Sequence, residues 1–113
     1  MWPIRGFDTI QTMKYQLFGK FTALDNRRDE LVGILLQASE LLKKNSDCIH
    51  YIISTSDNPN DVWVSEVWNS KAAHDASLNP EDIKALIKTA MPLIVSMPDQ
   101  TELSVLGGKG IGR

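Results

Sequence analysis

A run of turn-forming residues, TSDNPND at 55–61, separates two segments that are both typical of β-strands. The segments are CIHYIIS at 48–54 and VWVSEVW at 62–68, and both are dense in β-branched and aromatic side chains. Strands that follow each other across so short a turn pair antiparallel, so this region predicts a β-hairpin. Any fold of this chain must therefore be built around that pair.

Before the hairpin, the spacing of apolar residues changes from a strand period to a helix period. Residues 14–23 alternate apolar with polar side chains, which predicts a strand with one buried face. Between residues 27 and 44, leucine, isoleucine and alanine recur at three- and four-residue steps, the pattern of an amphipathic helix. A strand and then a helix therefore precede the hairpin.

After the hairpin, the sequence predicts helical structure and then a last strand. Ser70 can cap a helix that begins at Lys71, and Asn-Pro-Glu-Asp at 79–82 can begin another, with proline at its first position. TELSVL at 101–106 has the composition of a fourth strand. The order strand, helix, strand, strand, helix, strand predicts an α+β fold of the ferredoxin-like split β-α-β type. In that fold, helices cover one face of a four-stranded antiparallel sheet.

A chain of 113 residues is long enough for one compact domain with one core. We expect this domain to span residues 13–106. Residues 1–12 are then an N-terminal extension and residues 107–113 a C-terminal tail.

Composition is that of an ordinary globular protein, and it excludes several classes of function. The chain is 42% hydrophobic and 23% charged with a net charge of -2, so it offers no basic field to bind nucleic acid. No apolar run is long enough for a membrane span, and residues 1–12 do not resemble a secretory signal. The lone Cys48 can form no internal disulfide, which fits a reducing compartment, and we expect a cytoplasmic protein.

Four short elements follow one another in a defined order along the chain. They are DCIHYIIS with the DNPND turn after it, Glu66-x-Trp68, Ser70 with Ala73 and His74, and Gly107-Gly108-Lys109-Gly110. In this order and spacing they resemble the antibiotic biosynthesis monooxygenase family, which includes quinol and anthrone oxygenases. The resemblance covers roughly residues 13–110.

The resemblance implies a homodimer in which two sheets pair into an α/β barrel, with a pocket between each sheet and its helices. It also implies that O2 oxidises a small aromatic substrate of the quinol or anthrone type. Flavin, haem and metal take no part in that chemistry, so no cofactor is expected. Neither nucleic acid nor a membrane is an expected partner.

Two departures from the family's patterns narrow this expectation. Haem-degrading relatives carry a tryptophan and a histidine at places that correspond here to Ser77 and Ile87, which disfavours haem degradation. Anthrone oxygenases carry an asparagine where this chain has Val64. Either the substrate-polarising amide is missing, or Asn69 supplies it from a different direction.

Oxygenation without a cofactor requires a base that removes a phenolic proton, because the resulting anion is what passes an electron to O2. A histidine side chain titrates near neutral pH, and His50 is predicted to be this base. If the hairpin pairs symmetrically about residues 58–59, His50 lies opposite residues 66–68 and on the same face as Glu66. Glu66 would then orient the imidazole. Such a pair is as typical of a structural hydrogen bond as of a catalytic one.

Trp68, His74 and Asn69 are predicted to contact the substrate. Trp68 falls on the pocket side of the third strand, whereas Trp63 and Tyr51 are expected on the dimer side. A purely structural core tryptophan and a solvent-exposed helical histidine are the alternatives at Trp68 and His74.

Two functions remain open from the sequence. One is a cofactor-independent monooxygenase with His50 and Glu66 as catalytic residues. The other is a non-catalytic dimeric α/β barrel that binds a small ligand or serves as a scaffold. The first predicts an open cavity beside His50 and Glu66, whereas the second predicts that both face a filled core or a dimer seam.

Overall fold

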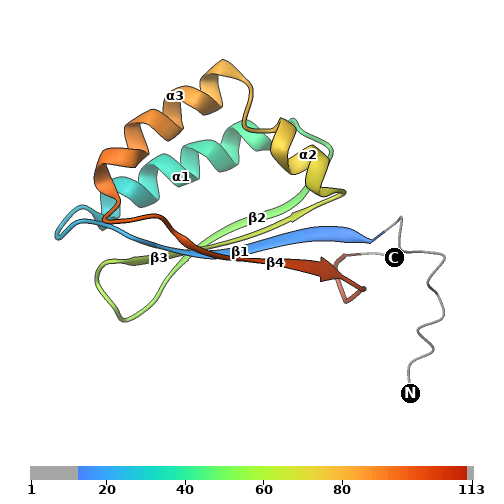
Figure 1. Ribbon diagram of the computed structural model, residues 1–113, viewed down its shortest axis with the longest axis horizontal. Coiled ribbons are helices and arrows are strands. Elements are labelled where there is room, and N and C mark those ends of the chain that lie inside the picture. The colour runs from blue at the N-terminus through green and yellow to red at the C-terminus, as the bar shows by residue number, and fades with distance from the viewer. Residues whose placement is uncertain (1–12, 112–113) are drawn as a thin grey trace.

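Four antiparallel strands form a single sheet in the computed structural model, which describes residues 13–111 (Figure 1). They are β1 (Lys14–Thr22), β2 (Cys48–Thr55), β3 (Asp61–Trp68) and β4 (Asp99–Val105). Their spatial order is β2-β3-β1-β4, so β1 and β3 pair in the centre although they are not consecutive. This is the ferredoxin-like split β-α-β topology, and it confirms the predicted α+β fold class.

Helices cover one face of this sheet (Figure 1). They are α1 (Arg28–Leu42), α2 (Lys71–Ala76), α3 (Glu81–Ala90) and the short 3-10 helix η2 (Met91–Leu93). The helical region after the hairpin is divided in two, as predicted, but α3 begins at Glu81, with Pro80 at the N-cap position rather than at the first helical position. Ser70 Oγ accepts a hydrogen bond from the Ala73 backbone N–H at 3.0 Å, so α2 begins directly after β3. Within the described part of the chain, no helix is both long and apolar enough to cross a membrane.

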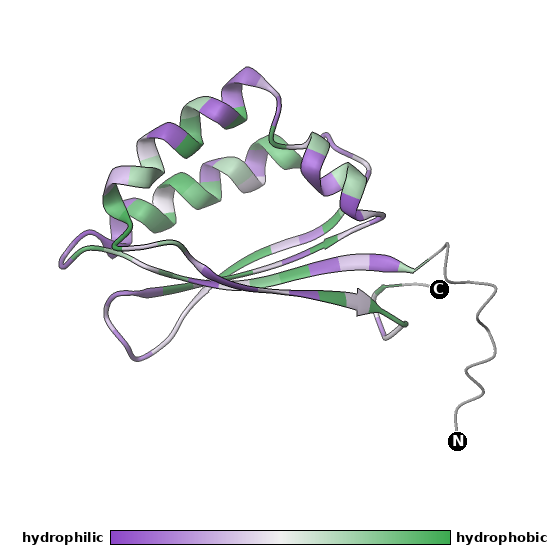
Figure 2. Cartoon of the chain, viewed as in Figure 1, coloured by the Kyte–Doolittle hydropathy of each residue, from purple (hydrophilic) through white to green (hydrophobic). Residues whose placement is uncertain are grey.

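The core lies between the sheet and the helices. Hydrophobic and hydrophilic residues alternate along α1 and α3, as expected of helices that bury one face (Figure 2). Leu31 and Leu35 of α1 lie one helical turn apart and belong to a buried cluster with Val64 of β3. Leu42, near the end of α1, belongs to a second buried cluster with Trp68. Apolar packing therefore links both ends of α1 to β3.

The other face of the sheet carries no helix among the described residues (Figure 1). Strand alternation places Phe18, Ile52 and Leu103 on this side, and all three are exposed. Trp63 lies there too, as its parity predicts, and its ring stacks on Phe18 at a centroid distance of 5.5 Å. We name these four residues the open-face patch.

The register between β2 and β3 differs from the arrangement expected for His50. His50 pairs with Val67, and Tyr51 pairs with Glu66. Because directly opposed residues share a face, Tyr51 lies on the same side of the sheet as Glu66, and His50 lies on the other side. An offset of one residue exchanges the two faces of a strand. The predicted placement of His50 beside Glu66 is therefore wrong, as is that of Tyr51 on the dimer side.

Candidate active site

A cavity of about 260 Å³ lies between the helix-covered face of the sheet and the helices. Most of its walls are aliphatic or aromatic, and its polar lining includes Glu66, His74 and Ser77. Such a pocket suits a mainly apolar ligand that carries a polar group. The apolar lining includes Leu17, Phe21, Ile34, Leu35, Tyr51, Trp68, Ile83, Leu86 and Ile87.

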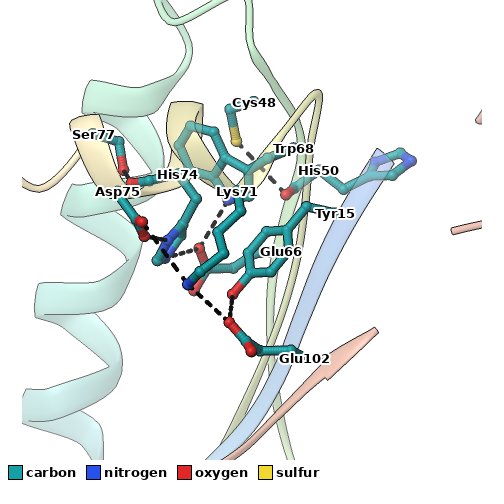
Figure 3. Close-up of polar contacts among 10 residues, drawn as sticks. All are labelled: Tyr15, Cys48, His50, Glu66, Trp68, Lys71, His74, Asp75, Ser77 and Glu102. Carbon is teal, nitrogen blue, oxygen red and sulfur yellow. Dashed lines mark hydrogen bonds and ion pairs between the residues drawn. The ribbon is translucent and has the colours of Figure 1, made fainter. Parts of the chain in front are cut away.

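Glu66, Trp68 and His74 converge in the wall of this cavity (Figure 3). The indole Nε1–H of Trp68 donates to Glu66 Oε1 at 3.0 Å, and His74 Nε2 lies 3.6 Å from the same oxygen. Only 12% of the His74 side chain and 13% of the Glu66 side chain are exposed. Burial raises the pKa of Glu66, while the Trp68 hydrogen bond and nearby His74 act in the opposite direction. Glu66 is therefore a carboxyl group that retains a proton more readily than one in water.

The three residues come together because a strand leads directly into a capped helix. Alternation along β3 turns both Glu66 and Trp68 toward the helices, and Trp68 is almost fully buried. The Ser70 cap then sets the start of α2, which places His74 one turn into the helix. The His74 ring packs edge-on against Trp68 at 5.7 Å and against the Tyr15 ring at 5.5 Å. These contacts hold the imidazole beside Glu66.

The second ring nitrogen of His74 faces the surface of the protein. Its Nδ1 lies 3.0 Å from Oδ1 of Asp75, whose side chain is 54% exposed (Figure 3). The hydrogen bond with His74 and the nearby Lys71 ammonium hold the pKa of the Asp75 carboxyl below its usual range. His74 thus connects a buried carboxyl group to an exposed one.

A cluster of polar side chains ties α2 to the sheet beside this site (Figure 3). The Tyr15 hydroxyl donates to Glu102 Oε2 at 2.8 Å, and Lys71 Nζ lies 2.9 Å from the same oxygen. Lys71 also lies 3.8 Å from Asp75 Oδ2. Hydrogen bonds from Lys71 and Tyr15 lower the pKa of Glu102, whereas burial and Glu102 raise the pKa of Tyr15. The cluster joins α2, β1 and β4.

Tyr51 is a lining residue that the sequence interpretation missed. It lies opposite Glu66 on β2, and its pKa is raised by burial and by the nearby Glu66 carboxyl. Counting residues across the turn is the only sequence signal for this position. The pairing of Thr55 with Val62 sets a register in which odd residues of β2 face even residues of β3.

His50 and Asn69 lie away from the cavity lining. The His50 ring is directed away from Glu66 and Trp68, as Figure 3 shows. The Asn69 side chain is exposed, and its Nδ2 donates to Asp47 Oδ1 at 3.0 Å. Asn69 therefore ties the end of β3 to the loop before β2. Among the predicted site residues, the structure brings together Glu66, Trp68 and His74.

No three or more histidine, cysteine, aspartate or glutamate residues within 13–111 are grouped as a metal site would require. The polar groups at the cavity are instead suited to moving protons. A buried carboxyl, an imidazole and an exposed carboxylate lie in sequence from the cavity to the surface.

The sequence pattern that defines the antibiotic biosynthesis monooxygenase family matches residues 17–89. A solved protein from Chloroflexus aurantiacus J-10-fl, named as a candidate antibiotic biosynthesis monooxygenase, is 32% identical to this chain. The match covers 88% of this chain and 99% of that chain, with a TM-score of 0.79. No curated protein sequence matches closely enough to add to this comparison.

Two more distant structures share the fold. One from Caulobacter crescentus CB15, also named as a candidate antibiotic biosynthesis monooxygenase, is 15% identical. It covers 91% of this chain and 99% of its own, with a TM-score of 0.78. A protein of unknown function from Nitrosomonas europaea is 23% identical and covers 88% of this chain and 95% of its own, with a TM-score of 0.73. The family pattern and the 32% identical relative together decide the classification. The chain belongs to the antibiotic biosynthesis monooxygenase family.

Proposed function

We propose that this protein is a cofactor-independent monooxygenase that oxidises a small quinol- or anthrone-like aromatic substrate with O2. The observation that carries the proposal is the apolar cavity of about 260 Å³ with buried Glu66 and His74 in its wall. Membership of the family and the names of two related structures support the same class of reaction.

The cavity favours a flat apolar substrate of limited size. Ligand pockets typically enclose about 300–1,000 Å³, so a cavity of about 260 Å³ suits a few fused rings rather than a haem-sized molecule. Tyr51, Trp68 and His74 supply aromatic surfaces in its lining, against which a substrate ring can pack.

Glu66 is the proposed base that removes the phenolic proton. Its ionised form is disfavoured by burial, and a base whose pKa is raised toward the working pH exchanges protons efficiently in both directions. The Trp68 N–H fixes the position of Glu66 Oε1, and His74 Nε2 lies 3.6 Å from the same oxygen. Glu66 and His74 are therefore the two groups that act together in the proposed proton transfer.

The reaction balances without an external electron donor. The phenolate passes one electron to O2, and the resulting radical pair combines to form a C–O bond. The Glu66–His74 pair returns the proton to the peroxide, the O–O bond breaks, and the ring C–H is lost as the carbonyl forms. A phenol and O2 thus give a quinone and water, with all four electrons supplied by the substrate.

The proposed assembly is a homodimer in which the open-face patch is covered by the same patch of a second copy. An uncovered apolar sheet face is typical of a protein interface, and a self-complementary surface is expected in a two-fold dimer. The cavity lies on the opposite face of the sheet, so both sites remain accessible in such a dimer.

Oxygen consumption with a panel of reduced naphthoquinols and anthrones tests the proposed function. We expect O2 uptake above the spontaneous rate and no product under anaerobic conditions. Glu66→Gln should lower kcat by roughly 10²–10⁴-fold, the range for losing a general base. Glu40→Gln is the matched control, because Glu40 is exposed on α1, outside the cavity lining, and forms a surface ion pair with Lys43.

Failure to exceed the spontaneous rate with any quinol or anthrone would contradict the proposed function. Quenching of tryptophan fluorescence by the same compounds, without O2 uptake, would instead support the non-catalytic ligand-binding alternative. Trp68 is a suitable reporter because it lines the cavity.

A further inference from the structure

We infer that Asp75 is a positioning residue that favours the Nδ1–H tautomer of His74 in the resting protein and connects Glu66 to solvent. The inference rests on the function proposed above and extends it from the base to its proton outlet. The two nitrogens of His74 face two carboxyl groups that differ in exposure. Glu66 is buried at the cavity, whereas Asp75 is open to water.

The hydrogen-bond geometry selects the tautomer. A neutral imidazole carries one N–H, and an ionised carboxylate can only accept a hydrogen bond. Asp75 lies 3.0 Å from Nδ1, so Nδ1 carries the proton and Nε2 presents its lone pair to Glu66. A lone pair and an ionised carboxylate repel each other, so the contact at 3.6 Å is most favourable when Glu66 is neutral and its O–H can turn toward Nε2.

Aromatic packing restricts the rotation of the His74 ring between Glu66 and Asp75. Trp68 lies edge-on at 5.7 Å and Tyr15 at 5.5 Å, from β3 and β1 respectively. Among residues 13–111, the charged groups within ion-pair distance of the His74 ring are Glu66 and Asp75. With the ring held between them, a proton can enter at one nitrogen while another leaves at the other.

The transfer balances as a relay. The O–H proton of neutral Glu66 moves to Nε2 while the Nδ1–H proton moves to the Asp75 carboxylate, which releases it to water. Glu66 is then ionised, accepts a hydrogen bond from Nε2–H, and is ready to take the phenolic proton. The reverse sequence carries a proton inward after that step, and no electron moves in either direction.

The surroundings of the relay include further titratable groups. Tyr51 and Cys48 approach Glu66 from β2, and the pKa of each is raised, so both stay neutral. Lys71 lies one turn before Asp75 on α2 and favours its ionised form, while Glu102 of β4 pairs with Lys71. The charged groups at the outer end therefore keep Asp75 ionised, so that it accepts a hydrogen bond from Nδ1–H and passes any proton it receives quickly to water.

Histidine 15N NMR on the full chain without a histidine tag tests the positioning role without any substrate. The chain contains two histidines, so a His50→Ala variant assigns the His74 signals. We expect the Nδ1–H tautomer in the wild type and the Nε2–H tautomer in Asp75→Ala. Asp29→Ala, at an exposed carboxylate on α1, is the control and should leave the tautomer unchanged. An unchanged His74 tautomer in Asp75→Ala would overturn the inference.

Steady-state kinetics with a quinol that the wild type oxidises test the relay itself. Removing a histidine's hydrogen-bond partner in metal sites costs roughly 10–100-fold, and we expect a similar loss of kcat in Asp75→Ala with KM unchanged. A raised KM with unchanged kcat would overturn the relay, since it would indicate only a structural role. If the wild type oxidises no substrate, the proposed function fails, while the tautomer measurement still decides whether Asp75 positions His74.

Discussion

Glu66 places an ionisable group in a cavity wall that is otherwise mostly apolar. Its side chain receives one hydrogen bond, from Trp68, and lies next to His74. Because a buried charge costs free energy unless it is compensated, the proposed catalytic role of Glu66 would come at the expense of stability.

Glu66→Gln should therefore raise the thermal stability of the protein at neutral and alkaline pH. The folded-state pKa of Glu66 is raised above its unfolded value of about 4.3, so the folded state binds more protons between the two values. The wild type consequently loses stability as pH rises through that window, and the neutral glutamine does not. We expect the Tm advantage of the variant to vanish near pH 4 and to be largest at pH 8.

Thermal melts of both proteins from pH 4 to pH 8 measure this effect. Glu40→Gln again serves as the control, because it removes an exposed carboxylate and should leave the pH dependence of Tm unchanged. A Tm difference between wild type and Glu66→Gln that grows toward acid pH would contradict the raised pKa.

The convergence of Glu66, Trp68 and His74 could be predicted from sequence because it depends on local geometry. Strand parity turns the first two to one side, and the Ser70 cap sets where His74 lies. The place of His50 depended instead on the pairing of two strands across a turn. A change of one residue in that register moves a side chain through the sheet, and turn composition does not fix it.

At the scale of elements, the contact between β1 and β4 depends on a glycine. Gly19 pairs with Gln100, and a Cβ on Gly19 would lie 2.9 Å from Gln100 Cγ and 3.2 Å from the Asp99 carbonyl oxygen. The second contact is to backbone, which cannot move without shifting the strand. Gly19→Ala should therefore destabilise the protein by about 1–3 kcal/mol, the usual cost of overpacking, as measured by urea unfolding.

Gly33→Ala provides a matched control, because it should stabilise the protein where Gly19→Ala should destabilise it. Gly33 lies inside α1, where an added Cβ would have no atom within 4 Å. Alanine restricts the unfolded chain and favours helix, so we expect a gain of about 0.4–1 kcal/mol. A Gly19→Ala variant as stable as Gly33→Ala would show that β4 adjusts without cost.

The helix and strand boundaries agree closely with the sequence periodicities. The helix predicted over residues 27–44 is observed as Arg28–Leu42, and the last strand begins at Asp99 rather than residue 101. The spacing of apolar residues and the capping residues predict such elements well, because both depend on interactions between residues close together in the sequence. The beginning of β4 lacks a strong apolar signal, since its pairing with β1 determines where it starts.

At the scale of the whole molecule, the open-face patch leads to a test of assembly. We expect the wild type to form a dimer of twice 12.6 kDa in light scattering after size exclusion. Ile52→Lys should dissociate it, because a charged side chain would be buried at the centre of an apolar interface. Ile52 is 51% exposed in the single chain, so the substitution should leave the fold of each subunit intact.

Leu36→Lys is the corresponding control on the helical side. Leu36 is also 51% exposed, but it lies on α1, outside both the open-face patch and the cavity lining. This variant should remain dimeric. A monomeric wild type at micromolar concentration, or equal dissociation of both variants, would contradict the proposed homodimer.

The overall topology followed from the order of periodicities along the chain. One strand and helix before the hairpin, and one helical region and strand after it, allow few arrangements that bury all the apolar stripes. The cavity could not be predicted in this way, because its walls come from side chains on eight elements that meet only after folding.

The polar groups of the cavity and its apolar walls come from different parts of the chain, which has a consequence for engineering the protein. The acid–base groups come from one short passage of chain, residues 66–75, whereas the aliphatic walls come from β1, α1 and α3. Under the proposed function, libraries restricted to wall positions such as Ile34, Leu86 and Ile87 should change which ring systems bind and leave Glu66 and His74 in place. New substrate ranges should be reachable by directed evolution in few steps, each tolerated by the rest of the molecule.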